Sequence, residues 1–133
     1  MALVPDVSAI LSQAFEDEDA AYAELVIEAI AGDEALVPTL FWFEIRNALL
    51  MGERRRRFTA AKTASFLSDL ELLPFVVDDL PREAAVFEFV RKYQLTIYDA
   101  TYLELAERKG LKLATLDDAL VKAARKAGVG VFK

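Results

Sequence analysis

The stretch Thr96–Leu120, TIYDATYLELAERKGLKLATLDDAL, organises the chain, because it is expected to form a helix, a turn and a strand in succession. Its apolar positions recur at helical spacing and predict a helix from about Tyr98 to Lys109. Gly110 follows two cationic residues, a pattern typical of a helix C-terminus. Residues 111–115 then predict a short strand that runs back along this helix and leads into another helix.

Two aspartates of this stretch are expected to meet in space. About eleven helical residues rise ~16 Å, and about four or five strand residues cover ~13–17 Å. The strand should therefore end near the start of the helix, which places Asp117 beside Asp99. Each aspartate alone is also explained as a favourable acidic residue at a helix N-terminus. The pair needs a further reason, because neighbouring carboxylates repel each other.

The composition limits the chemistry that the chain can perform. Its 133 residues, of which 55 % are hydrophobic, predict one domain over residues 1–133 with a proper core. The absence of cysteine excludes disulfides, thiolate catalysis and Cys-ligated zinc, and histidine is absent too. A metal site must then rest on carboxylates, which favour hard ions such as Mg²⁺ or Mn²⁺. With no secretion signal and no membrane-spanning apolar run, we expect a cytoplasmic protein with no membrane partner.

Short apolar runs alternate along the chain with helices or helix pairs. This alternation predicts an α/β fold with a central, mostly parallel sheet of about five strands and helices on both faces. In such a sheet the carboxyl ends of the strands share one edge, where ligand sites form. The expected strands are residues 3–5, 36–38, 75–77, 111–115 and 129–132, and the expected helices are residues 8–15, 20–30, 40–54, 60–70, 81–93, 98–109 and 119–127.

Further polar side chains follow these strand ends. Asp6 follows the first strand, and taken alone it is best explained as the cap of the next helix. Glu44 interrupts an apolar helix face and should be partly buried, where a carboxylate is costly unless it is paired or binds a cation. A buried salt bridge or hydrogen bond would also explain Glu44, and Asn47, one turn on, is a candidate neighbour. Ser8 and Thr115 add hydroxyls at two strand ends.

Four carboxylates, Asp6, Glu44, Asp99 and Asp117, are thus expected to converge at one sheet edge. One acidic residue there is usually a cap, but four together indicate a divalent cation. In a site without histidine the natural chemistry is phosphodiester hydrolysis, in which the metal polarises the phosphoryl oxygen and lowers the pKa of a water. We therefore interpret the four as catalytic and metal-binding residues.

The sequence resembles the PIN-domain nucleases, and specifically the VapC-like toxins of toxin–antitoxin pairs. The matching pieces are VPDVSAIL, FEIRNALL, YDATYLELA and LATLDDAL, which occur in the expected order over nearly the whole chain. Each piece alone is weakly specific, and the ordered set carries the resemblance.

The resemblance implies a Mg²⁺- or Mn²⁺-dependent endoribonuclease that cleaves single-stranded RNA. Its ligands would fall on the same four carboxylates, with Ser8 and Thr115 as supporting hydroxyls near the metal. It also implies a homodimer that a cognate VapB-like antitoxin neutralises. The chain departs from the family in Pro5, which precedes the first aspartate, and in the aromatic residues before Glu44. Asp118 is an extra carboxylate that would substitute for or assist Asp117.

Three further functions stay open at this point. A receiver-like signalling domain is also a parallel α/β fold with acidic residues at a sheet edge, and Asp78 and Asp79 end the third expected strand. Only Asp6 follows the first strand, however, and the lysine that a receiver needs after its last strand is missing at the usual place. A PIN fold that only binds RNA would fit the same pattern of residues, and so would a PIN nuclease that processes RNA.

A cluster of arginines stands out in a chain whose net charge is −6. Arg54, Arg55, Arg56 and Arg57 form a run of four, whereas the acidic total argues against a polyanionic partner. The run is explained equally well as a contact for the RNA backbone, as a contact for an acidic antitoxin tail, or as a solvated helix end.

Overall fold

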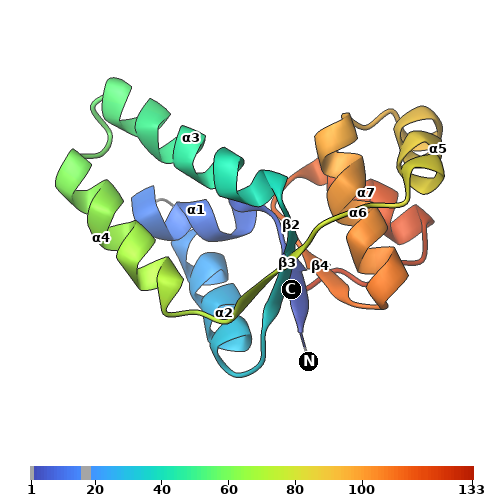
Figure 1. The fold of residues 1–133 in the computed structure, drawn as a ribbon, viewed down its shortest axis with the longest axis horizontal. Helices are drawn as coiled ribbons and strands as arrows, with labels where there is room; N and C mark the ends of the chain where they lie inside the picture. The colour runs from blue at the N-terminus through green and yellow to red at the C-terminus, as the bar shows by residue number, and fades with distance from the viewer. Residues whose placement is uncertain (1, 16–18) are drawn as a thin grey trace.

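The computed structural model describes residues 2–15 and 19–133, and it shows a sheet between two groups of helices (Figure 1). Neighbouring strands are parallel, and their order across the sheet is β3-β2-β1-β4. The predicted α/β class is therefore confirmed. The strands are β1 (Leu3–Pro5), β2 (Ala35–Pro38), β3 (Phe75–Asp78) and β4 (Lys112–Ala114).

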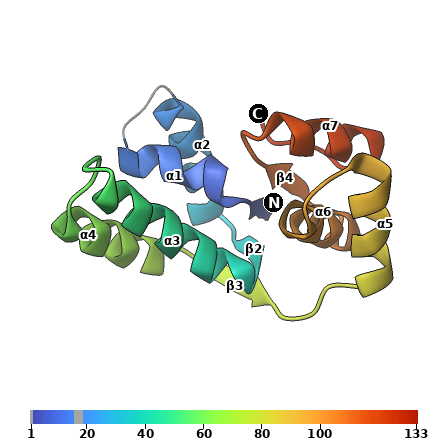
Figure 2. The ribbon, with the colours of Figure 1, turned by 90° about the horizontal axis from the view of Figure 1, so that it is seen from above.

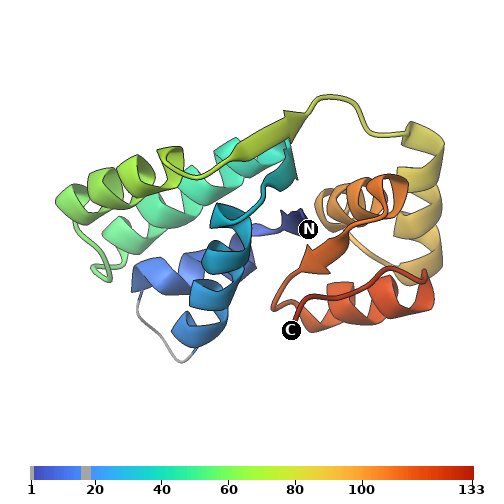
Figure 3. The same cartoon turned by 90° about the horizontal axis from the view of Figure 1, so that it is seen from below.

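The helices cover both faces of the sheet, with α1 to α4 on one side and α5 to α7 on the other (Figure 2). Strand β3 and the loop after it carry the chain from one helical layer to the other (Figure 3). Within residues 2–15 and 19–133, every helix is too short or too polar to span a bilayer. The helices are α1 (Val7–Phe15), α2 (Ala20–Ala31), α3 (Leu40–Arg54), α4 (Ala60–Glu71), α5 (Glu83–Tyr93), α6 (Ile97–Lys109) and α7 (Asp118–Lys126).

The core runs through the sheet because both of its faces are covered. Central strands of such a sheet read as continuous apolar runs, and all three residues of β1 are buried. Helix α6 is buried at every position from Ala100 to Ala106, since it lies against β1, β2 and β4. A single cluster of apolar side chains joins the two helical layers. The position of α6 is therefore fixed by packing over most of its length.

Most predicted element ends agree with the structure, although the residues before the helices differ in whether they form a cap. Gly110 ends α6 with a φ of 65°, which glycine adopts without strain, and the side chain of Thr59 accepts the backbone N–H of Lys62. Asp19 and Thr39 precede α2 and α3 without a side-chain cap bond. Pro81 does not open α5, which begins two residues later at Glu83.

The strand expected over residues 129–132 is reduced to one parallel bridge between Val131 and Leu113. The N–H of Leu113 donates to the carbonyl of Gly130, and the N–H of Phe132 donates to the carbonyl of Leu113. Leu113 is the one residue of β4 that is paired in this way, whereas all three residues of β4 pair with β1. The described part of the chain thus has four strands where about five were expected.

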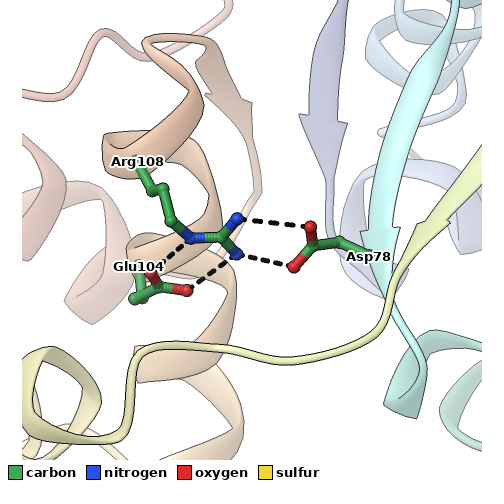
Figure 4. Close-up of polar contacts among 3 residues, drawn as sticks. All are labelled: Asp78, Glu104 and Arg108. Atoms are coloured by element: carbon green, nitrogen blue, oxygen red, sulfur yellow. Dashed lines mark hydrogen bonds and ion pairs between the residues drawn. The ribbon is translucent and has the colours of Figure 1, made fainter.

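A network of charged side chains ties β3 to α6 (Figure 4). The guanidinium group of Arg108 donates two hydrogen bonds to Asp78, of 2.6 and 3.2 Å, and two to Glu104, of 2.7 and 3.2 Å. The side chain of Glu104 is only 1 % exposed, whereas those of Arg108 and Asp78 are 21 % and 20 % exposed. The forked geometry of arginine satisfies both carboxylates at once. These bonds hold the pKa of Asp78 below its ordinary value.

Candidate active site

The four candidate carboxylates lie where the carboxyl ends of parallel strands and the starts of helices meet. Asp6 directly follows β1, and its backbone N–H donates to the carbonyl of Ala114 at the end of β4. Asp117 comes just before α7, Asp99 lies in the first turn of α6, and Glu44 follows β2 near the start of α3. Helix α6 is longer and β4 is shorter than predicted, at 13 and 3 residues, but Asp99 and Asp117 are close enough for the charge of one to act on the other.

Asp6 is the most enclosed of the four, at 6 % exposure, and hydrogen bonds hold both of its carboxylate oxygens. Oδ1 accepts the hydroxyl of Ser8 at 2.6 Å and the backbone N–H of Ala9 at 3.1 Å, while Oδ2 accepts the hydroxyl of Thr115. Asp6 therefore caps α1, as one interpretation of the sequence held, and it is also the centre of a polar network. Ser8 and Thr115 reach Asp6 from the ends of β1 and β4.

The same hydroxyls join the loop after β1 to the loop after β4. Ser8 Oγ accepts the backbone N–H of Leu116 at 2.9 Å, and Thr115 Oγ1 accepts the backbone N–H of Asp117 at 3.1 Å. Asp117 in turn caps α7, because its Oδ1 accepts the N–H of Leu120 at 2.9 Å. The network orders the backbone on which two of the four carboxylates stand.

Glu44 is half-buried, as its apolar helix face predicted, and its partner is a tyrosine of the other helical layer. The hydroxyl of Tyr102 donates to Glu44 Oε1 at 2.7 Å. Asn47, the neighbour suggested by the sequence, is exposed. Tyr102 was not predicted, although its position three residues after Asp99 places both on one side of α6 and was a usable signal.

The electrostatics show that the carboxylates act on one another. Burial raises the pKa of Asp99, and the charges of Asp117 and Asp6 raise it further. Burial also raises the pKa of Glu44; the Tyr102 hydrogen bond lowers it, and the charges of Asp6 and Asp99 raise it. The pKa of Asp6 is raised by burial, against its three hydrogen bonds, with Asp117 adding to the rise. Negative charge is thus concentrated where β1 and β4 end.

The remaining candidates lie at the surface. Asp118 is exposed in the first turn of α7, next to Asp117. Arg54–Arg57 are exposed at the far end of α3, and ten residues of helix between Glu44 and Arg54 rise about 15 Å. Figure 1 shows this end of α3 pointing away from the sheet. The guanidinium of Arg57 lies over the ring of Phe15, 4.5 Å from its centroid. The three interpretations of the arginine run stay open.

A PIN-domain family model matches residues 3–126. The chain belongs to the PIN-domain family. A curated relative of this PIN domain, Ribonuclease VapC3 from Pyrobaculum aerophilum, is 30 % identical over 127 residues, which cover 92 % of this chain and 94 % of the relative. The resemblance to VapC-like proteins seen in the sequence motifs is therefore confirmed.

Solved structures agree with this assignment. PAE2754 from Pyrobaculum aerophilum is 26 % identical with a TM-score of 0.67, over 92 % of this chain and 79 % of that one. FitAcB from Neisseria gonorrhoeae is 18 % identical with a TM-score of 0.68, over 100 % of this chain and 97 % of that one, and it supports the fold alone. The receiver-like interpretation is therefore wrong.

The donor set of this PIN domain fits a hard divalent cation by its chemistry. It consists of carboxylate oxygens. Burial raises the pKa of Asp6, Glu44 and Asp99, their mutual repulsion with Asp117 raises it further, and a bound cation would offset both effects. As the side chains stand, no three His, Cys, Asp or Glu residues within 2–15 and 19–133 are placed to share one ion. Holding a metal would thus draw the carboxylates closer together than they are here.

The raised pKa values imply that the metal-free PIN domain becomes more stable as the pH falls from 7 toward about 4, the range of unfolded carboxyl groups. In that window the folded Asp6, Glu44 and Asp99 bind more protons than the unfolded chain, so stability decreases with rising pH. Asp78 has the opposite effect on folding stability, because its pKa is lowered in the folded state. The stability that its ionised form contributes is lost as the pH falls through that lowered pKa.

Urea unfolding midpoints at pH 7, 6 and 5, in EDTA and at constant ionic strength, measure this dependence. Asp99→Asn should flatten it, because the variant removes one of the mutually repelling charges. Asp69→Asn, which changes the same charge at an exposed position of α4, should leave it unchanged. A midpoint that rises with pH over this range would contradict the electrostatic description of the site.

Proposed function

We propose that this PIN domain, comprising residues 1–133, is a Mg²⁺- or Mn²⁺-dependent endoribonuclease that hydrolyses single-stranded RNA. The observation that carries the proposal is the electrostatic coupling of Asp6, Glu44, Asp99 and Asp117 at the carboxyl edge of the sheet. Asp6 is buried, Glu44 and Asp99 are half-buried, and Asp117 is exposed. Enclosed carboxylates that repel one another are costly for folding, which is reasonable where they serve a cation. The name of the relative Ribonuclease VapC3 supports a nuclease.

The four carboxylates would hold the metal, and each contributes in a different way. Asp6 is held by Ser8, Ala9 and Thr115, so its oxygens have fixed directions. Glu44 and Asp99 come from opposite helical layers, and Asp117 is held by its cap of α7. When bound, Mg²⁺ or Mn²⁺ supplies positive charge for the phosphodiester and lowers the pKa of a water. Asp118, beside Asp117, is proposed only as an auxiliary acidic group.

We further propose that the protein is the toxin of a toxin–antitoxin pair, acts in the cytoplasm, forms a homodimer, and is neutralised by a VapB-like antitoxin. The resemblance to VapC-like proteins supports these assignments. Exposed aromatic side chains also support a protein interface near the site: Trp42 and Phe43 precede Glu44, and Tyr98 precedes Asp99, with exposures of 54 %, 66 % and 58 %. Apolar surface of this kind is typical of interaction sites.

The test is cleavage of a labelled single-stranded RNA by purified protein that is free of antitoxin. We expect cleavage with Mg²⁺ or Mn²⁺ and none in EDTA, with recovery when the metal is restored in excess. A preparation of Asp99→Asn made in parallel controls for contaminating ribonucleases. Cleavage that continues undiminished in EDTA would refute the metal mechanism, and RNA binding without cleavage would favour a PIN fold that only binds RNA.

A further inference from the structure

We propose that Tyr102 is a positioning residue that fixes the carboxylate of Glu44 for metal binding. The proposal rests on the proposed function, in which Glu44 is a ligand of Mg²⁺ or Mn²⁺. It assigns a role to a buried side chain that comes from the opposite side of the sheet. Tyr102 itself would touch neither the metal nor the RNA.

The hydrogen bond between the two residues crosses from one helical layer to the other. Glu44 stands on α3 and Tyr102 on α6, and these helices lie on opposite sides of the sheet (Figure 2). The Tyr102 hydroxyl donates to Glu44 Oε1 at 2.7 Å, and Tyr102 is 1 % exposed. A tyrosine so deeply enclosed has little freedom to move, so its hydroxyl is a fixed point for the glutamate.

The bond decides which oxygen of Glu44 is left for another partner. The Tyr102 hydroxyl occupies Oε1, and the second oxygen, Oε2, stays free of this bond. Glu44 is close enough to Asp6 and Asp99 for their charges to act on its carboxylate. A glutamate side chain has several rotatable bonds, and fixing one oxygen in advance reduces the entropy lost when a ligand binds.

Helix α6 supplies two of the parts that the site needs. Asp99 lies in its first turn, and Tyr102 follows three residues later, so both lie on the same side of the helix. Because α6 is packed against three strands, it aligns Asp99 directly and Glu44 through Tyr102. Removing a partner of this kind, which holds a ligand without touching the metal, typically lowers metal affinity or activity 10–100-fold.

A purely structural role for Tyr102 predicts a different experimental result. A buried hydroxyl needs an acceptor, and Glu44 provides one, whatever Glu44 then does. In that case removing the hydroxyl would change folding stability, and any change in metal affinity would not depend on the Glu44 carboxylate. The two roles therefore differ in whether the effect of the Tyr102 hydroxyl on metal affinity requires the Glu44 carboxylate.

The experiment measures Mn²⁺ binding to the purified protein without RNA, by the loss of the free Mn²⁺ signal in electron paramagnetic resonance. Tyr102→Phe keeps the ring and removes the hydroxyl, and we expect its Mn²⁺ affinity to fall about tenfold. In a protein that already carries Glu44→Gln, adding Tyr102→Phe should cause no further loss, because the two changes remove one interaction. Tyr93→Phe, a hydroxyl removed from the half-buried ring on α5, is the matched control.

Each outcome has one meaning. Unchanged Mn²⁺ affinity in Tyr102→Phe, or an equal loss with and without Glu44→Gln, overturns the positioning role. If Tyr102→Phe does not fold, Glu44→Asp tests the same bond from the other side, since the shorter side chain withdraws from Tyr102; unchanged affinity there also overturns it. Wild-type protein that binds no Mn²⁺ refutes this proposal and the metal mechanism together. Protein whose Mn²⁺ affinity depends on Tyr102 and Glu44 as expected, but that cleaves no RNA, refutes only the proposed function.

Discussion

Asp99→Asn is expected to reduce RNA cleavage by about a thousandfold or more while raising the stability of the metal-free protein. The substitution removes one charge from the ligand set with almost no change of shape. Metal ions contribute several kcal/mol of transition-state stabilisation, and about 4 kcal/mol corresponds to a thousandfold in rate. Asp99 has a raised pKa because burial and the charges of Asp117 and Asp6 act on it, so removing its charge relieves repulsion in the folded state.

The opposite signs of the two effects make this prediction specific. Most substitutions that inactivate an enzyme by damage lower its stability, whereas here cleavage is lost and the urea midpoint in EDTA rises. Single-turnover cleavage at saturating Mn²⁺ and urea unfolding at pH 7 are the two measurements. Asp69→Asn has the same change in net charge on exposed α4 and should retain full cleavage. An Asp99→Asn protein with wild-type cleavage would remove Asp99 from the proposed ligands.

The meeting of Asp99 and Asp117 could be predicted because it depends only on local geometry. The part of α6 that follows Asp99 rises about 15 Å, and β4 with its flanking residues runs back over a comparable distance after Gly110 reverses the chain. The position of Asp6 followed from a second local rule, since it comes directly after a buried strand in a parallel sheet. The hydroxyls of Ser8 and Thr115 belong to the same strand ends, and the structure brings both to Asp6.

The partner of Glu44 could not be predicted in the same way. Spacing along α3 indicated burial correctly but suggested Asn47, because only neighbours on the same helix are visible in a periodic pattern. The actual donor, Tyr102, lies in the other helical layer and meets Glu44 only after the sheet has placed α3 and α6 on opposite faces. Contacts of this type depend on how α6 crosses the strands, a property of the packed structure.

The strand expected at residues 129–132 illustrates a different limit. Its apolar residues suit a strand, and Val131 does pair with Leu113, but the pairing is limited to this bridge. A side-chain pattern indicates that a segment can pair, whereas the number of residues that pair depends on how the two segments lie in the packed structure. The Arg54–Arg57 run is different, because the predicted helix over residues 40–54 has the bounds of α3 and the distance of the run from Glu44 followed from the sequence.

Arg108→Leu is expected to lower the free energy of unfolding by about 3 kcal/mol, the lower end of the cost of breaking a buried ion pair by removing one partner. The loss arises mainly at Glu104, whose side chain is 1 % exposed and would be left charged without its two hydrogen bonds from Arg108. Asp78, at 20 % exposure, can turn to water and should contribute less. Arg108→Lys should cost an intermediate amount, because lysine keeps the charge but cannot bond both carboxylates in the forked geometry.

Urea unfolding of single and double variants separates these contributions. Adding Glu104→Leu to Arg108→Leu should recover most of the lost stability, because an apolar pair of similar volume often replaces a buried ion pair at little cost. Asp78→Asn alone should cost less than Arg108→Leu. If Arg108→Leu is as stable as the wild type, or if Glu104→Leu fails to restore it, then the buried charge of Glu104 is not what makes Arg108 necessary. Helix α6 also carries Asp99 and Tyr102. Mn²⁺ binding by the same variants therefore shows whether the link from α6 to β3 is needed to hold the carboxylate site in place.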